Sequence, residues 1–117
     1  MGYESRIYVV EKRERLGKDI KKYAQKIAVF DICKFDFGNI FQKETDCYIY
    51  ADDGNTKILE DCYGDPLKEA SIEDVINCLE TYNSTQEHYR RVAPLLGLLK
   101  GFDSSEWDNL AVLHYGY

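Results

Sequence analysis

The sequence predicts an α+β fold: one domain with a mostly antiparallel sheet of four to five strands and two helices packed on one face. Predicted strands come first, two predicted helices follow, and a last strand closes the chain, an order that segregates helices from the sheet. The 117 residues fit a single domain, residues 1–117, with one core. The composition, 44% apolar and 31% charged, is that of a globular chain.

The first two strands are predicted from β-branched and aromatic runs. Residues 6–10 (RIYVV) favour a strand. In the charged segment 11–26, Leu16, Ile20 and Tyr23 have the spacing of a short amphipathic helix. Residues 26–37 (KIAVFDICKFDF) are apolar on both faces of their first half, which is typical of a strand inside a sheet. We therefore expect this strand at the centre of the sheet.

A central hairpin of the sheet is predicted at residues 46–61, in the middle of the chain. Two alternating runs flank Asp53-Gly54, and an Asp-Gly pair favours a two-residue type I′ turn because both central residues need positive φ. The expected cross-strand pairs are Ile49 with Ile58, Tyr50 with Lys57, and Tyr48 with Leu59.

Two helices and a closing strand follow a turn at residues 63–66. Ser71 and Asp74 match a helix start, and apolar residues continue at helical spacing to about residue 82. A second helix is predicted at about 86–100 with a break near Pro94, which lacks a backbone N–H. Its leucines wrap most of the helix, so it should be buried or paired. Residues 109–115 (NLAVLHY) predict a last strand that inserts beside an early one.

The net charge of −6 is uneven. Residues 12–26 carry seven Lys or Arg against two acids, a local +5, which leaves −11 on the rest. The acidic balance argues against direct nucleic-acid binding, because duplex affinity comes mostly from phosphate neutralisation. We interpret the basic segment as a solvated face. The chain has no run of eighteen apolar residues and no signal peptide, so we expect a cytoplasmic protein without a membrane partner.

Residue types that often carry chemistry lack the spacing of known motifs. The cysteines, which we interpret as core or free thiols, form no C-x-x-C pair, and His114 lies in an apolar strand. No nucleophile elbow, zinc-protease helix or phosphate loop is present, so we predict no enzyme activity and no cofactor. The acids of residues 52–61 lack EF-hand spacing, and the turn explains them without a metal. The cysteines are Cys33, Cys47, Cys62 and Cys78.

Ten tyrosines and one tryptophan are the most informative feature of the composition. Tyrosine offers a rigid contact area with a hydroxyl and is enriched at the centres of interfaces. We hypothesise that several of the tyrosines on or beside the predicted strands stand exposed together near acidic residues, as a surface that binds a protein. The candidate binding residues are Tyr48, Tyr50, Asp52, Asp53, Asp61, Tyr63, Tyr115 and Tyr117.

The segments GYESRIYVVEK, YADDGNTKILEDCYGDPLKEA, YRRVAPLLGLLKGF and LAVLHYGY span most of the chain. With them the chain resembles small proteins encoded in phages and prophages of low-GC Gram-positive bacteria. The group has no established activity, so the resemblance assigns no catalytic residue. It implies a context in which small acidic proteins act by binding, including as inhibitors of host defence or host enzymes.

The leading hypothesis is therefore a non-enzymatic phage or prophage accessory protein that binds a host or phage protein, as an inhibitor or a DNA mimic. A charge of −11 outside residues 12–26 would imitate phosphate spacing if the acids gathered on one face. One alternative is a small-ligand or nucleotide binder that holds phosphate with Arg90, Arg91 or the basic segment. Others are an enzyme using Asp, Cys and His, and a structural protein that forms homo-oligomers through residues 94–102.

Overall fold

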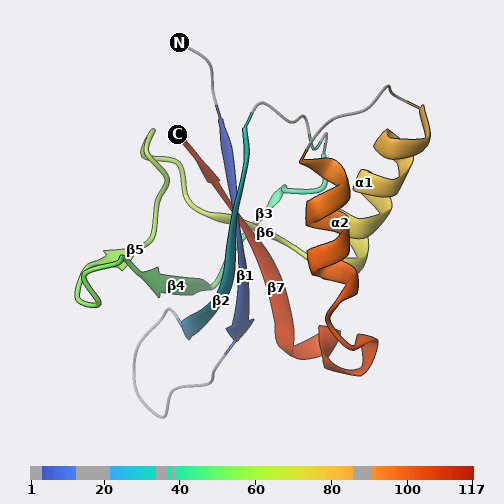
Figure 1. Ribbon diagram of the computed structural model, residues 1–117. Helices are drawn as coiled ribbons and strands as arrows, with labels where there is room; N and C mark the ends of the chain where they lie inside the picture. Colours follow the sequence, from blue (N-terminus) through green and yellow to red (C-terminus); the bar gives the residue numbers. More distant parts are fainter. Residues whose placement is uncertain (1–3, 13–21, 34–36, 38, 86–90) are drawn as a thin grey trace.

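The computed structural model describes residues 4–12, 22–33, 37, 39–85 and 91–117. Over these residues the chain forms one sheet of seven strands in the order β3-β6-β7-β1-β2-β4-β5, with two α-helices on one side (Figure 1). Every neighbouring pair is antiparallel except β2 and β4. The elements are β1 (Ser5–Lys12), β2 (Lys22–Cys33), β3 (Lys43–Glu44), β4 (Cys47–Tyr50), β5 (Lys57–Ile58), β6 (Lys68–Ala70), α1 (Ile72–Thr85), α2 (Val92–Lys100), the 3₁₀ helix η1 (Ser104–Asn109) and β7 (Leu110–Gly116).

The middle strand of the sheet is β1, because both of its faces are apolar. Successive side chains of a strand point to opposite faces. Ile7 and Val9 are fully buried against the helices, whereas Tyr8 and Val10 are buried on the other face. The last strand, β7, lies antiparallel beside β1, as predicted. Glu4 and Tyr117 extend this pairing by exchanging two backbone hydrogen bonds.

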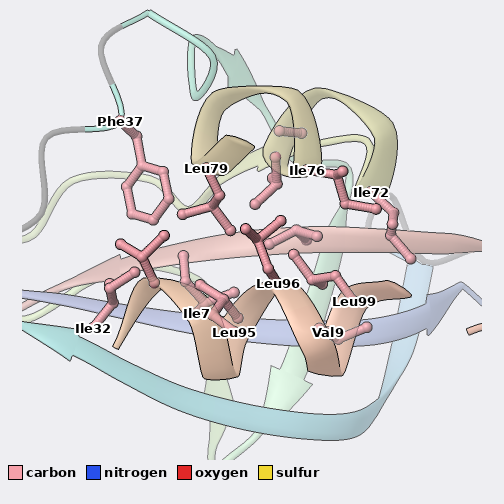
Figure 2. Packing of buried hydrophobic residues seen from close by; sticks show 14 of the residues in the cluster. Ile7, Val9, Ile32, Phe37, Ile72, Ile76, Leu79, Leu95, Leu96 and Leu99 are labelled. Atoms are coloured by element: carbon pink, nitrogen blue, oxygen red, sulfur yellow. The ribbon is translucent and has the colours of Figure 1, made fainter. Parts of the chain in front are cut away.

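The larger core lies between the sheet and the two helices (Figure 2). Helix α1 begins where predicted, with the Ser71 hydroxyl accepting a hydrogen bond from the Asp74 N–H at 3.1 Å. Helix α2 begins at Val92, so Pro94 falls in its first turn, where a missing N–H costs little. The predicted segment 86–90 lies outside the described residues. The helices bury apolar side chains that include Ile72, Ile76, Leu79, Leu95, Leu96 and Leu99.

A smaller core covers part of the opposite face of the sheet. Strands β4 and β5 lie on the side away from the helices (Figure 1). Cys47 and Ile49 of β4, together with Leu67, pack there against Val10 and Leu113. The sheet is therefore covered on both sides near its centre, and this second layer is supplied by the predicted hairpin and the segment after it.

The hairpin has the predicted pairing but a different turn and a different place. Ile49 lies opposite Ile58 and Tyr50 opposite Lys57, as predicted. The two-residue turn is wrong: the Gly54 N–H bonds the Ala51 carbonyl, and the Ala51 N–H bonds the Thr56 carbonyl. Residues 52–55 form a longer loop centred on the same point, so the pairing is unchanged. The hairpin is also at one end of the sheet and not at its centre.

Three further predictions are corrected. Seven strands replace the predicted four to five, because β3 and β6 have only two and three residues and leave no periodic pattern. Tyr23, assigned to a short helix, belongs to β2, and residues 13–21 lie outside the described residues. Strand β2, expected at the centre of the sheet, pairs with β1 but meets β4 only at Lys22 and Tyr23, so most of its length is not interior.

Candidate functional site

Two of the three predicted acids accept hydrogen bonds within their own turns. The Asp53 carboxylate accepts hydrogen bonds from the backbone N–H groups of Asn55 and Thr56 and from the Thr56 hydroxyl, at 2.6 to 2.9 Å. The Thr56 hydroxyl and these N–H groups lower the pKa of Asp53 to about 2. Asp61 accepts from the N–H groups of Tyr63 and Asp65. These two carboxylates therefore stabilise the turns in which they lie.

The predicted tyrosines fall into two groups, of which the first surrounds Tyr48. We call Tyr23, Tyr48, Tyr50 and Lys57 the Tyr48 cluster. The Tyr48 ring lies 5.9 Å from that of Tyr23 and 5.6 Å from that of Tyr50, between ring centroids, and the Lys57 ammonium lies 4.6 Å from its centroid. Tyr48 itself is 1% exposed, which corrects its place in an exposed patch. Within this group, Tyr50 remains half-buried.

The second group comes from β1 and β7, on the face of the sheet that is turned away from the helices. We call Arg6, Tyr8, Tyr115 and Tyr117 the Arg6 cluster. The guanidinium carbon of Arg6 lies 4.7 Å from the Tyr117 ring centroid and 6.0 Å from that of Tyr115, distances typical of cation–π contacts. Arg6 also donates to the Asp31 carboxylate at 2.6 Å, and this hydrogen bond raises the pKa of Arg6 further. The Arg6 guanidinium and the rings of Tyr115 and Tyr117 therefore combine a positive charge with flat aromatic groups.

Residues between β5 and β6 extend the Arg6 cluster. The Cys62 N–H bonds the Gly116 carbonyl at 3.0 Å, which holds residues 61–63 beside the end of β7. Burial, together with the neighbouring Cys62 and Tyr8, raises the pKa of Tyr115. Tyr63 is 54% exposed, so the structure brings Tyr63, Asp61, Tyr115 and Tyr117 to one end of the face.

Lys26 of β2 lies between the two clusters. Its ammonium is 5.9 Å from the Tyr8 ring centroid and 3.5 Å from the Asp52 carboxylate. Asp52 is the fully exposed acid of the hairpin loop. The eight predicted residues thus do not form one patch: Tyr48 and Tyr50 belong to the Tyr48 cluster, and Tyr115 and Tyr117 belong to the Arg6 cluster.

The most exposed apolar side chains on the described strands belong to β2. Ile27 is 44% exposed and Val29 is 51% exposed. Val29 lies opposite Tyr8 of β1, so it shares the face of the Arg6 cluster. The pairing with β1 skips Ile27 between Lys26 and Ala28, a bulge that moves this side chain outward. Two β-branched side chains therefore stand in solvent beside the tyrosines.

The same stretch of β2 has an unpaired edge. From Ala24 to Phe30, no strand in the described part of the chain pairs with the side of β2 that faces away from β1. We call this side the open edge. The Arg91 guanidinium donates to the Asp31 carbonyl at one end of it. An unpaired edge presents backbone donors and acceptors that can pair with another strand.

The Cys47 thiol and the His114 imidazole both have shifted pKa values. Burial raises the pKa of the Cys47 thiol to about 11, so the reactive thiolate is scarce at neutral pH. Burial lowers the pKa of His114, whose ring contacts Phe37 and Phe41 and shares a 2.8 Å hydrogen bond with the Ser5 hydroxyl. Within the described residues, no three His, Cys, Asp or Glu side chains gather as metal ligands.

Sequence reasoning missed four residues around the Arg6 cluster and the open edge: Arg6, Lys26, Ile27 and Val29. Ile27 and Val29 were assigned to a strand covered on both sides, since alternation reports an apolar side chain and not what covers it. Arg6 and Lys26 gave no local signal, because the rings that they contact come from β7 and β1. The signal for Ile27 and Val29 would have been a strand that is apolar on both faces but has a second neighbouring strand along only part of its length.

Comparison with known proteins found no matching family model, curated protein or solved structure. Neither described α-helix has the length and apolar character needed to cross a bilayer.

Proposed function

We propose that the chain is a non-enzymatic binding protein that pairs the open edge of β2 with an extended strand of a host or phage protein. The observation that carries the proposal is the combination of an unpaired edge with the exposed Ile27 and Val29. Soluble proteins usually protect such edges with charges, prolines or short strands. Here the side chains at the middle of the edge are β-branched and apolar, which favours strand addition.

The chemistry of the edge describes the partner segment. In strand addition, backbone hydrogen bonds supply affinity and alternate side chains supply specificity. Val29 lies on the face of the Arg6 cluster, so the partner should carry β-branched or aromatic side chains at every second position on that face. The Arg6 cluster and Lys26 lie beside this row, where they can contact the partner's polar rim.

The alternative functions have less support. For phosphate binding, Arg91 is already bonded to the Asp31 carbonyl, while Arg90 and residues 13–21 lie outside the described residues. For oligomerisation through α2, Leu95, Leu96 and Leu99 are buried in the chain's own core. For DNA mimicry, the Asp53 and Asp61 carboxylates are occupied by backbone N–H groups. The phage or prophage context stays a prediction.

The proposal is tested by charging the edge without disturbing the core. Lysines on edge strands oppose pairing, so Ile27→Lys combined with Val29→Lys should lower partner capture from a Gram-positive host lysate by about tenfold. Glu73→Lys combined with Asn77→Lys adds two lysines on the exposed side of α1 and serves as the control. Quantitative mass spectrometry of the captured proteins gives the ratio. Equal capture by both variants and the unmodified chain would refute the proposal.

A further inference from the structure

A pocket of about 440 Å³ is lined by none of the residues of the Tyr48 cluster or the Arg6 cluster. It is bounded by the end of β1, by β3 and β6, by the first turn of α1, and by the junction of η1 with β7. Its volume is in the range of small-molecule sites. The open edge of β2 contributes no residue to this pocket either.

One charged pair in the pocket is already satisfied. The Glu69 side chain is 8% exposed, and the Lys12 ammonium lies 2.8 Å from its Oε2 and 3.1 Å from its Oε1. Burial alone would lower the pKa of Lys12, but the hydrogen bond and charge of Glu69 more than offset it, and the pKa is raised. Lys12 also lies 3.4 Å from Asp46, while Lys43 lies 3.9 Å from Glu69. The positive charges of the two lysines are therefore balanced by the negative charges of Glu69 and Asp46.

Two other carboxylates line the pocket without such a partner. Asp74 comes from the first turn of α1 and Asp108 from η1, and both residues are exposed. Among the described residues, neither carboxylate makes an ion pair or a side-chain hydrogen bond. A ligand that enters therefore meets negative charge from two elements, α1 and η1.

An indole completes the lining. Trp107 is half-buried, and its N–H already donates to the Phe102 carbonyl at 3.2 Å. The indole ring itself lines the pocket, together with the apolar side chains of Ile40 and Leu110. Tryptophan is the side chain that holds cations best over its ring face. Apolar lining with a few convergent polar groups is the usual make-up of a ligand site.

We propose that this pocket binds an organic cation, a ligand that carries an ammonium or guanidinium group on an apolar stem. The cationic group would lie between Asp74 and Asp108, and the stem would lie along Trp107. An anion is disfavoured, because it would face Asp74 and Asp108 while Lys12 is already held by Glu69. The guanidinium fits two carboxylates through its fork of N–H donors.

The test uses agmatine, which carries a guanidinium and an ammonium on a four-carbon stem, with glutarate as the anionic counterpart. Trp107 is the only tryptophan in the chain, so its fluorescence reports binding at the pocket directly. We expect saturation with agmatine below about 10 mM, and no saturation with glutarate. Asp108→Asn, alone or with Asp74→Asn, should raise the half-saturating concentration about tenfold, which is the loss of about 1.4 kcal/mol.

The matched control is Glu73→Gln combined with Glu106→Gln. It removes two acids from the same two elements, α1 and η1. Neither Glu73 nor Glu106 lines the pocket, so the half-saturating concentration of agmatine should stay within about twofold of that of the unmodified chain. Asp108→Asn leaves α1 untouched, so the test does not depend on a helix terminus. Circular dichroism of each variant confirms that it is folded before titration.

A second probe separates the two sources of such a cation. N-acetyl-argininamide presents the same guanidinium on a peptide backbone, as a partner chain would. Tighter binding of agmatine assigns the pocket to a free small molecule, and tighter binding of the blocked arginine assigns it to an arginine of a polypeptide. Both results support the proposal. It is overturned if neither probe saturates, if glutarate binds as well, or if the control variant weakens binding as much as Asp108→Asn.

Discussion

At the scale of residues, His114 shows how position in the fold sets chemistry. Burial lowers its pKa below the ordinary value of 6.5, while the charge of Asp61 opposes the change. The native state therefore resists taking up a proton that the unfolded chain accepts readily. The stabilising contribution is complete above pH 6.5 and is lost as the pH falls through 6.5 towards the lowered native value.

His114→Gln removes this linkage while keeping a polar group that can reach the Ser5 hydroxyl. We expect the variant to lose less unfolding free energy than the unmodified chain between pH 7 and pH 5, because glutamine does not titrate. Urea unfolding at the two pH values measures the difference. His88 is present in both proteins, so its contribution cancels. Equal losses in the two proteins would show that the imidazole is not held neutral by the fold.

The sequence indicated the setting of this histidine but not its partners. An apolar strand predicts a structural role for His114, which agrees with the contacts to Phe37 and Phe41. Those contacts could not be predicted, because the phenylalanines precede β3 and meet β7 only after the sheet has formed. In the same way, Tyr48 reads as an exposed ring on a hairpin, and the β2–β4 pairing then buries it under Tyr23.

At the scale of elements, α2 shows where periodicity alone is ambiguous. Four leucines surround Gly97, and a helix apolar all round is either buried or paired with another chain. The structure resolves the ambiguity: Leu95, Leu96 and Leu99 lie in the core between sheet and helices, and Leu98 is half-buried at its margin (Figure 2).

Alanine substitutions in α2 should therefore differ by face. Leu95→Ala deletes a fully buried side chain and should lower the unfolding free energy by about 2–5 kcal/mol. Leu98→Ala changes the same residue type in the same helix and should lower it by about 1 kcal/mol or less, because part of its surface is already in water. Chemical denaturation of both variants gives the comparison. Similar losses would mean that the helix is packed on both sides.

Long elements were predictable and short ones were not. Strands β1 and β7 and helix α1 carry enough residues for composition, spacing and a cap to agree. Strands β3 and β6 have two and three residues, and they exist because β7 offers an edge on which β6, and then β3, can pair. Their formation depends on the sheet, so no window of sequence contains the signal.

At the scale of the whole molecule, the order of strands determines which surfaces remain open. The predicted layers are present, and the last strand inserts beside the first. The position of the hairpin was the error with most consequence: at the end of the sheet, β4 covers only the start of β2. The rest of β2 is left with an open edge, and Ile27 and Val29 are left in solvent.

Site-specific photocrosslinking measures most directly whether this edge binds another protein. A photoreactive phenylalanine analogue replaces Val29 in one variant and Asn77, on the exposed side of α1, in another. After irradiation in host lysate, we expect a discrete adduct at position 29 that excess unmodified chain removes and the Ile27→Lys, Val29→Lys variant does not. An absent adduct at position 29, or adducts of equal yield at both positions, would contradict the account.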